Sequence, residues 1–128
     1  MDTIEDLEDE RWTQIDSGGK YYISTHGRVK SYQGRYAKLL KPYTNQHGYL
    51  RVDINSSRRR TYLVHQLVAL AFIPNDNPIE KDTVDHIDLD KTNNKVDNLR
   101  WLSRADNIRA YQEQKKGQVT SADDWNKS

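Results

Sequence analysis

The chain has 128 residues, no cysteine, 30% charged residues and a formal net charge of +1 at pH 7. This length favours a single domain, and the lack of cysteine excludes disulfides and every zinc site built on thiolates. The longest apolar run, residues 67–73, is too short to cross a membrane, and the acidic N-terminus is not typical of a signal peptide. We therefore expect a protein of a reducing, cytoplasmic compartment that has no membrane partner.

Charge is distributed unevenly along the chain. Residues 1–10 contain six acidic and no basic residues, whereas residues 11–74 contain eleven basic and two acidic residues. We expect residues 1–10 to be a disordered acidic arm that adds solubility or screens the basic surface. A basic segment with interleaved tyrosines is typical of a phosphate-binding surface, and the alternative is a solvated charged face without a partner.

The first predicted structure is a compact β module over residues 11–47. Residues 21–24 and 28–31 are predicted strands, joined by a turn in which Gly27 permits a positive φ. The rest of the module, residues 32–47, is polar and is expected to be irregular.

A second hairpin is predicted from residues 49–54 and 60–64, which alternate in polarity. Three consecutive arginines, Arg58, Arg59 and Arg60, lie at or near its tip. Because no base-reading pattern is evident, we expect them to contact phosphates.

A short helix is predicted over residues 65–72, ending before Pro74, with an apolar stripe on one face. His65 opens this helix. Its expected role is structural, in the core or at the helix cap, and the alternative is an accessory role in contact with a bound substrate strand.

The stretch from Val84 to Tyr111 predicts a strand, a polar loop, a second strand and a helix. Asp85 and His86 are adjacent, so a regular strand would point them to opposite faces, and a site that uses both needs a twist or bulge there. Residues 103–106 have the spacing of a capping box, which places Asn107 in the first helical turn, where it can face Asp85. Carboxylate and amide oxygens are ligands suited to Mg²⁺, and a neutral histidine beside them can accept a proton from water.

The polar loop begins like an EF-hand, but calcium binding of that type is excluded. Asn93 occupies the position that needs glycine, and Leu99 occupies the position that needs a bidentate glutamate. The polar loop residues are instead expected to hold the loop by bonding to its backbone. They are Asp88, Asp90, Asn93 and Asn94.

The run DHIDLDKTNNKVDNLRWLSRADN resembles the core of HNH nucleases, in the version found in phage and group I intron endonucleases. The upstream VHQLVALAFIPN resembles the segment that precedes this core, and ERWTQIDSGGKYYISTHGRVKS resembles a small module often found before it. Together these cover about residues 11–110. The implied fold is α+β, with N-terminal β hairpins, then a helix and a ββα-metal nuclease core over residues 48–116, followed by a flexible tail at 117–128.

The resemblance implies a metal-dependent DNA endonuclease of the homing-endonuclease type. His86 matches the general base, Asp85 and Asn107 match the metal ligands, and Asn98 matches the residue that braces the loop and orients His86. The implied metal is Mg²⁺, for which Mn²⁺ may substitute, and no zinc is expected.

The implied partner is double-stranded DNA, and a monomer that nicks one strand is favoured. Seven basic residues are expected to bind DNA: Arg28, Lys30, Arg51, Arg58, Arg59, Arg60 and Arg104. If the protein is phage-encoded, as the resemblance implies, it acts in the cytoplasm of a bacterial host. The alternative is a catalytically silent DNA-binding or phage packaging-partner module derived from such a nuclease.

Overall fold

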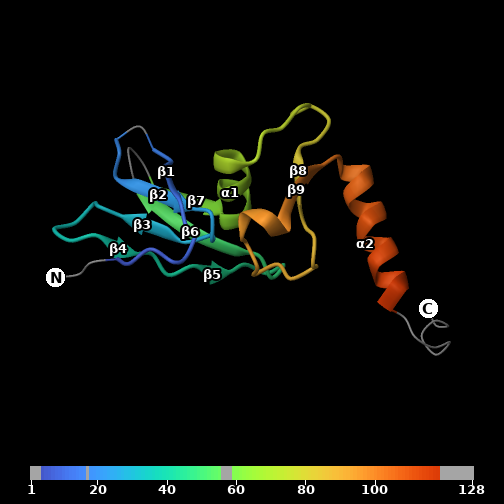
Figure 1. The fold of residues 1–128 in the computed structure, drawn as a ribbon, viewed down its shortest axis with the longest axis horizontal. Helices are drawn as coiled ribbons and strands as arrows, with labels where there is room; N and C mark the ends of the chain where they lie inside the picture. The colour runs from blue at the N-terminus through green and yellow to red at the C-terminus, as the bar shows by residue number, and fades with distance from the viewer. Residues whose placement is uncertain (1–3, 17, 56–58, 119–128) are drawn as a thin grey trace.

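A computed structural model describes residues 4–16, 18–55 and 59–118 of the chain. Its strands form three antiparallel sheets, of order β1-β2-β3-β4, β5-β6-β7 and β8-β9. The elements in chain order are β1 (Trp12–Gln14), β2 (Tyr21–Ser24), β3 (Val29–Ser31), β4 (Lys38–Leu39), β5 (Tyr43–Thr44), β6 (Leu50–Asn55), β7 (Arg59–Leu63), α1 (Val64–Phe72), β8 (Thr83–His86), the 3-10 helix η1 (Val96–Asn98), β9 (Leu99–Leu102) and α2 (Arg104–Gln118). The N-terminal sheets lie at one end of the molecule and α2 at the other (Figure 1). The expected α+β architecture is confirmed.

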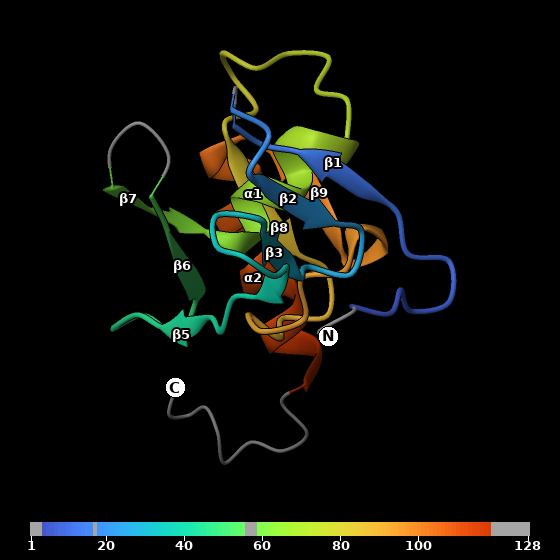
Figure 2. The same cartoon turned by 90° about the vertical axis from the view of Figure 1, so that its left-hand side faces the viewer.

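Helix α1 is the centre of the hydrophobic core. Val64, Val68 and Ala69 are fully buried, and α1 contacts β2, β6, β7, β8 and β9. In Figure 1, α1 lies between the N-terminal strands and β8-β9, and the end-on view of Figure 2 superimposes these elements. Because one short helix joins the β sheets to the nuclease-like segment, both halves share a single core.

Three short strands were not predicted. Strands β4 and β5 lie in the segment expected to be irregular, and β1 adds an edge strand that pairs Trp12 with Ser24. Strands β4 and β5 have two exposed residues each, so they carry too little apolar alternation to be read from sequence.

Residues 4–10 differ from the disordered arm expected there. Glu10 is buried and accepts a hydrogen bond from Arg28 Nε at 2.9 Å, while Arg28 also donates to the carbonyl oxygen of Glu5 at 2.9 Å. Trp12 Nε1 donates to Asp6 at 2.9 Å. Burial alone would raise the pKa of Glu10, but the hydrogen bonds from Arg28 and from the backbone of Leu7 lower it to about 2. Composition could not show that this acidic segment has a specific cationic partner.

The turn between β2 and β3 packs directly on the loop after β8. The backbone N–H of Val96 donates to the carbonyl oxygen of Thr25 at 2.9 Å. Gly27 has a φ of +83°, and a Cβ there would lie 3.0 Å from the Cβ of Asn94. The N-terminal module therefore supports the segment in which the candidate site lies.

Some predictions fall outside the described residues. These are Arg58, the first three residues of the acidic arm and the tail beyond residue 118, whereas residues 117 and 118 belong to α2. Within the described chain, neither helix is both long and apolar enough to span a membrane.

Candidate active site

The predicted strand–loop–strand–helix unit is confirmed. Strands β8 and β9 pair in antiparallel register, with Asp85 opposite Arg100 and His86 opposite Leu99. Helix α2 follows, and the backbone N–H of Asp106 donates to Ser103 Oγ at 3.1 Å, as expected for an N-cap serine. A cleft lies between β8 and α2 of this unit.

The cleft has a volume of about 590 Å³ and gathers three of the predicted site residues, Asp85, His86 and Asn107. The ladder continues through Asp85 and His86 without an inserted residue, so the expected bulge is not present there. Both residues are buried, and both still line the cleft. Of the twist or bulge expected here, the regular ladder leaves the twist, which is large in two-stranded ribbons.

In both Asp85 and Asn107, one side-chain polar atom forms a hydrogen bond and the remaining oxygen does not. Asp85 Oδ2 accepts a hydrogen bond from Arg100 Nε at 2.8 Å, and Asn107 Nδ2 donates to Thr83 Oγ1 at 3.1 Å. Within the described chain, Asp85 Oδ1 and Asn107 Oδ1 have no hydrogen-bond partner. No cluster of three or more His, Cys, Asp or Glu that could hold a metal exists among the described residues. A carboxylate and an amide oxygen fit a Mg²⁺ ion that keeps several waters, because that ion takes only one or two protein ligands.

His86 is oriented by Asn94, which the sequence had not singled out for this role. His86 Nε2 lies 2.7 Å from Asn94 Oδ1, in a buried contact. Because an amide oxygen only accepts hydrogen bonds, Nε2 carries the proton and Nδ1 is the basic nitrogen of the ring.

Asn98 braces the loop, and its role in orienting His86 stays a prediction, because the polar side chain that contacts His86 is Asn94. Asn98 Nδ2 donates to Asp88 Oδ1 and to the carbonyl oxygen of Asn93, each at 2.9 Å, and its Oδ1 accepts from the backbone N–H of Asp88 at 3.0 Å. Asp88 accepts the backbone N–H of Asp90 at 2.8 Å and Asp90 that of Thr92 at 3.0 Å, as predicted, whereas Asn93 donates to the Asp88 carboxylate at 2.8 Å. Asn94 belongs to the His86 contact instead.

The ring of His65 packs against the ring of His86. Its ring centroid lies 4.9 Å from that of His86 and 4.9 Å from that of Tyr49. The side chain is buried, and its Nδ1 has no hydrogen-bond partner in the described chain. Burial, and secondarily the proximity of His86, lowers the pKa of His65 from 6.5 to about 4, so the ring is neutral at pH 7.

The basic residues predicted to bind DNA fall into different environments. Arg104 lines the cleft, and its side chain forms no ion pair or hydrogen bond with any residue the structure describes. Arg28 is committed to Glu10 and Glu5, and Lys30 Nζ lies 4.1 Å from the Trp12 ring centroid. Of the predicted set, Arg104 is therefore the one placed at the cleft.

The arginines of the second hairpin divide between the two faces of its sheet. Arg59 pairs with Asn55 and donates to Asp53 at 3.1 Å, on the face that also carries Arg51. Arg60 pairs with the buried Ile54 and so belongs to the opposite face. Arg59 and Arg60 cannot act as one contiguous patch.

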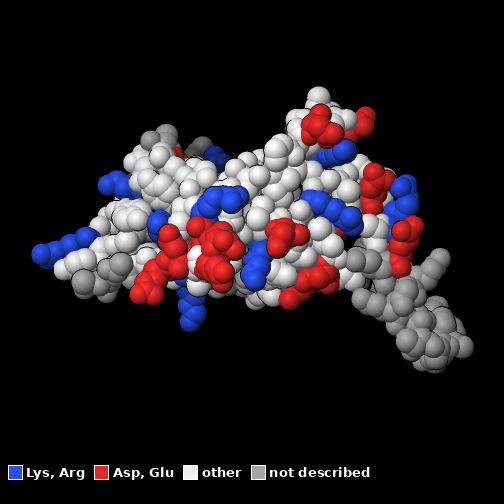
Figure 3. Space-filling view, in the orientation of Figure 1, with Lys and Arg blue, Asp and Glu red and all other residues white. Residues whose placement is uncertain are grey.

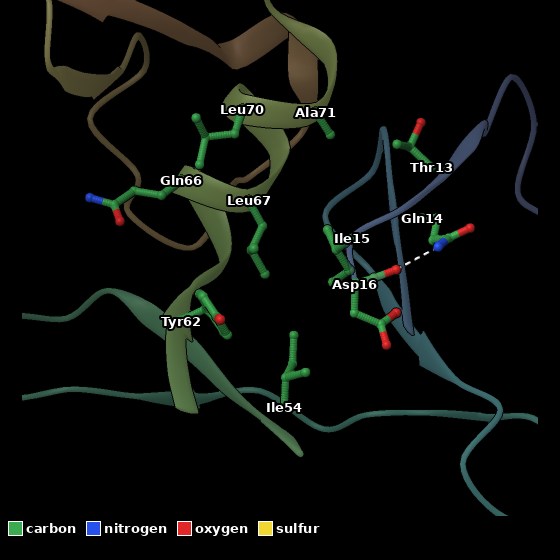
Figure 4. Close-up of a pocket in the computed structure, with 10 residues that line it drawn as sticks. All are labelled: Thr13, Gln14, Ile15, Asp16, Ile54, Tyr62, Gln66, Leu67, Leu70 and Ala71. Carbon is green, nitrogen blue, oxygen red and sulfur yellow. Dashed lines mark hydrogen bonds between the residues drawn. The ribbon is translucent and has the colours of Figure 1, made fainter. Parts of the chain in front are cut away.

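A second cleft, of about 460 Å³, lies on the other side of α1, where Leu67 and Leu70 face Ile15, Ile54 and Tyr62 (Figure 4). Its acidic residue, Asp16, accepts the backbone N–H groups of Lys20 and Tyr21. No histidine is among the described residues that line it, so this cleft has no candidate general base comparable to His86.

Two family models match the chain. Residues 62–109 match the HNH endonuclease family, and residues 10–55 match the NUMOD4 motif. The chain belongs to the HNH endonuclease family. The resemblance drawn from the sequence is thereby confirmed for both the nuclease core and the module before it.

Relatives of this chain include viral proteins. The chain is 35% identical over 106 residues to an uncharacterized HNH endonuclease of Acanthamoeba polyphaga mimivirus, covering 77% of this chain and 25% of that protein. It is 35% identical over 91 residues to DNA endonuclease I-HmuI of Bacillus phage SP01, covering 70% of this chain and 50% of I-HmuI.

A solved structure of the HNH homing endonuclease I-HmuI, whose subject is DNA binding and cleavage by that enzyme, matches with a TM-score of 0.66 and 30% identity. The match covers 88% of this chain and 63% of that chain. The matched part of the chain thus spans a quarter of the length of the mimivirus protein and half of the length of I-HmuI.

Proposed function

We propose that this HNH-family chain is a divalent-metal-dependent endonuclease that hydrolyses phosphodiester bonds in double-stranded DNA. The observation that carries the proposal is the single cleft in which Asp85, His86 and Asn107 meet, with His86 held by Asn94. The division into residues 11–47 and 48–116 is part of this proposal; the order of its two parts is supported by the family matches at residues 10–55 and 62–109.

In the proposed reaction, His86 Nδ1 removes a proton from water as the water oxygen attacks phosphorus. The bond to the 3′ oxygen breaks, this oxygen takes a proton from solvent, and the products are a 3′-hydroxyl and a 5′-phosphate. Asn94 keeps the proton on Nε2, so that the basic nitrogen is the one used. His65 is neutral and therefore adds no charge that would oppose protonation of its neighbour.

Asp85 and Asn107 would hold the metal, Mg²⁺ or in its place Mn²⁺, through the oxygens that their other contacts leave uncommitted. When bound, such an ion stabilises negative charge that develops on the phosphate oxygens. Arg100 contacts the Asp85 carboxylate from the opposite strand at 2.8 Å, which limits its rotation.

DNA as the substrate is supported by the similarity to I-HmuI and by cations at and near the cleft. Arg104 lines the cleft. Arg51 and Arg59 lie on the same face of the β6–β7 sheet, and by strand alternation Tyr49, which lines the cleft, belongs to that face too. One ββα site cuts one strand, so a monomer nicks. If the protein is phage-encoded, as I-HmuI of Bacillus phage SP01 is, the reaction takes place in the bacterial cytoplasm.

A plasmid assay tests the proposal. With Mg²⁺, the protein is expected to convert supercoiled plasmid to the open-circular form, and EDTA should abolish the conversion. Linear product formed without an open-circular precursor would contradict the monomeric nickase. DNA binding without conversion in either Mg²⁺ or Mn²⁺ would identify the chain as a silent DNA-binding module instead.

A further inference from the structure

One wall of the cleft carries a lysine to which the proposed reaction gives no role. Lys91 lines the same cleft as Asp85, His86 and Asn107, but it comes from the loop after β8, whereas Arg104 comes from the first turn of α2. Two cationic side chains from different elements therefore line the cleft that contains Asp85 and His86.

The Lys91 side chain is directed by contacts with the turn before β6. Its Nζ donates to the carbonyl oxygen of His47 at 2.9 Å and lies 4.9 Å from the Tyr49 ring centroid. Gly48 has a φ of +87°, and a Cβ there would lie 3.6 Å from Lys91 Cδ. A distance of 3.6 Å is ordinary van der Waals contact, so the stem of Lys91 packs against this turn, and the positive φ is what favours glycine at position 48.

The turn and the loop that hold Lys91 are themselves braced. Asn45 Oδ1 accepts the backbone N–H of His47 at 2.8 Å and that of Tyr49 at 3.0 Å. On the other side, Asp90 Oδ1 accepts the hydroxyl of Thr92 at 2.6 Å. Both ends of the contact are thus placed by short-range side-chain hydrogen bonds, not by the lysine alone.

Lys91 has no anionic partner among the described residues. Asp85 is the acidic residue in the cleft wall, and Arg100 already pairs with it at 2.8 Å. Among the described residues, neither Lys91 nor Arg104 forms an ion pair. An ammonium group has three donors, and the carbonyl oxygen of His47 accepts one of them.

We propose that Lys91 binds a non-bridging phosphate oxygen of the DNA strand lying in this cleft, beside the bond that is cut. The ligand is a phosphodiester, recognised by a cation that the loop and the turn hold in place. This inference rests on the proposed endonuclease function. The competing role is purely structural, with Lys91 acting as a tether between the loop and the turn.

The test compares Lys91→Met, which keeps the stem and removes the charge, with Lys91→Arg and with a matched control. The control is Lys81→Met, because Lys81 pairs with Asp76 in the segment between α1 and β8 and does not line this cleft. Affinity for a short duplex is measured in EDTA over a range of NaCl concentrations, and nicking of supercoiled plasmid is measured in Mg²⁺ with protein in excess. Thermal unfolding is recorded for each variant.

Lys91→Met is expected to reduce the slope of log K against log salt by about one unit, since each phosphate contact on B-DNA contributes roughly 0.9. It should slow nicking by about tenfold or more, the scale of one charge-assisted hydrogen bond. Lys91→Arg should restore most of both losses, and Lys81→Met should match the wild type.

If Lys91→Met has the salt slope of the wild type, Lys91 does not bind a phosphate. A lower melting temperature in that case would show that Lys91 serves as a structural tether between the loop and the turn. A reduced slope with unchanged nicking would overturn its placement beside the cut bond. If the wild-type protein does not nick DNA at all, the endonuclease proposal fails, whereas the salt slope in EDTA still decides whether Lys91 binds phosphate.

Discussion

At the scale of single residues, His65 makes stability depend on pH. Its pKa is about 4 in the folded protein and 6.5 when exposed, so the unfolded chain binds the proton more readily. The contribution of His65 to stability is complete above pH 6.5 and is lost as the pH falls toward 4. The full loss corresponds to about 3 kcal/mol, from roughly 1.36 kcal/mol per pKa unit.

His65→Phe should therefore flatten the fall in unfolding free energy between pH 7 and pH 4, measured by urea denaturation. Phenylalanine keeps an aromatic ring against Tyr49 and His86 but cannot titrate. His47→Phe, at an exposed position, serves as the control and should leave the curve unchanged. Equal pH dependence in the wild type and His65→Phe would refute the buried neutral state of His65.

The candidate site could be predicted from sequence only as far as its spacing allowed. Asp85, His86 and Asn107 were predicted together because their separations follow the strand–loop–strand–helix pattern, and the cleft contains all three. Asn94 was not assigned to His86, because it lies in a loop rich in Asp and Asn, any of which could bond to the backbone. Which polar side chain turns toward the histidine depends on the folded path of that loop.

At the scale of elements, the β2–β3 turn supports the loop that orients His86. Gly27→Ala would place a Cβ 3.0 Å from the Cβ of Asn94 and 3.1 Å from its carbonyl oxygen, at a φ of +83°. We expect a loss of about 1 to 3 kcal/mol in unfolding free energy, from the positive φ and the close contact. Nicking should also slow, because Asn94 must move.

Gly34→Ala is the matched control for Gly27→Ala. A Cβ at Gly34 meets no atom within 4 Å, and its φ is not positive. Urea denaturation and plasmid nicking measured on both variants separate a specific effect of Gly27 from a general effect of glycine replacement. Wild-type nicking by a folded Gly27→Ala protein would show that the turn does not influence His86.

The elements that could be predicted are those with a strong local signal. Helix α1 was expected over residues 65–72 and is observed as Val64–Phe72, because its apolar stripe has helical spacing and Pro74 follows. Strands β4 and β5 could not be predicted, because pairing with a neighbouring strand defines them more than their own two residues do.

At the scale of the whole molecule, charges that are separated along the sequence are brought close together by the fold. Acidic and basic side chains are interspersed on the face seen in Figure 3. Part of this neutralisation is specific, because Glu10 pairs with Arg28 and Asp53 accepts from Arg59. DNA binding is therefore expected to depend on the position of individual cations and not on total charge.

The two faces of the β6–β7 hairpin provide a test of this expectation. Arg51→Ala and Arg59→Ala should each lower DNA affinity on all sequences and reduce the salt slope by about one unit. Arg60→Ala removes the same charge from the opposite face and should leave the slope close to that of the wild type. A larger effect from Arg60 than from Arg59 would place the DNA on the other side of the sheet.

The general-base role of His86 is the central claim, and the nicking rate of His86→Ala at saturating protein with Mg²⁺ tests it most directly. His47→Ala is the matched control, because its exposed ring does not line the cleft. We predict that His86→Ala loses a factor of about 10² to 10⁴ in rate, the usual contribution of general acid–base catalysis, while its DNA affinity and that of His47→Ala stay at the wild-type value. Nicking by His86→Ala at the wild-type rate would contradict the proposed mechanism.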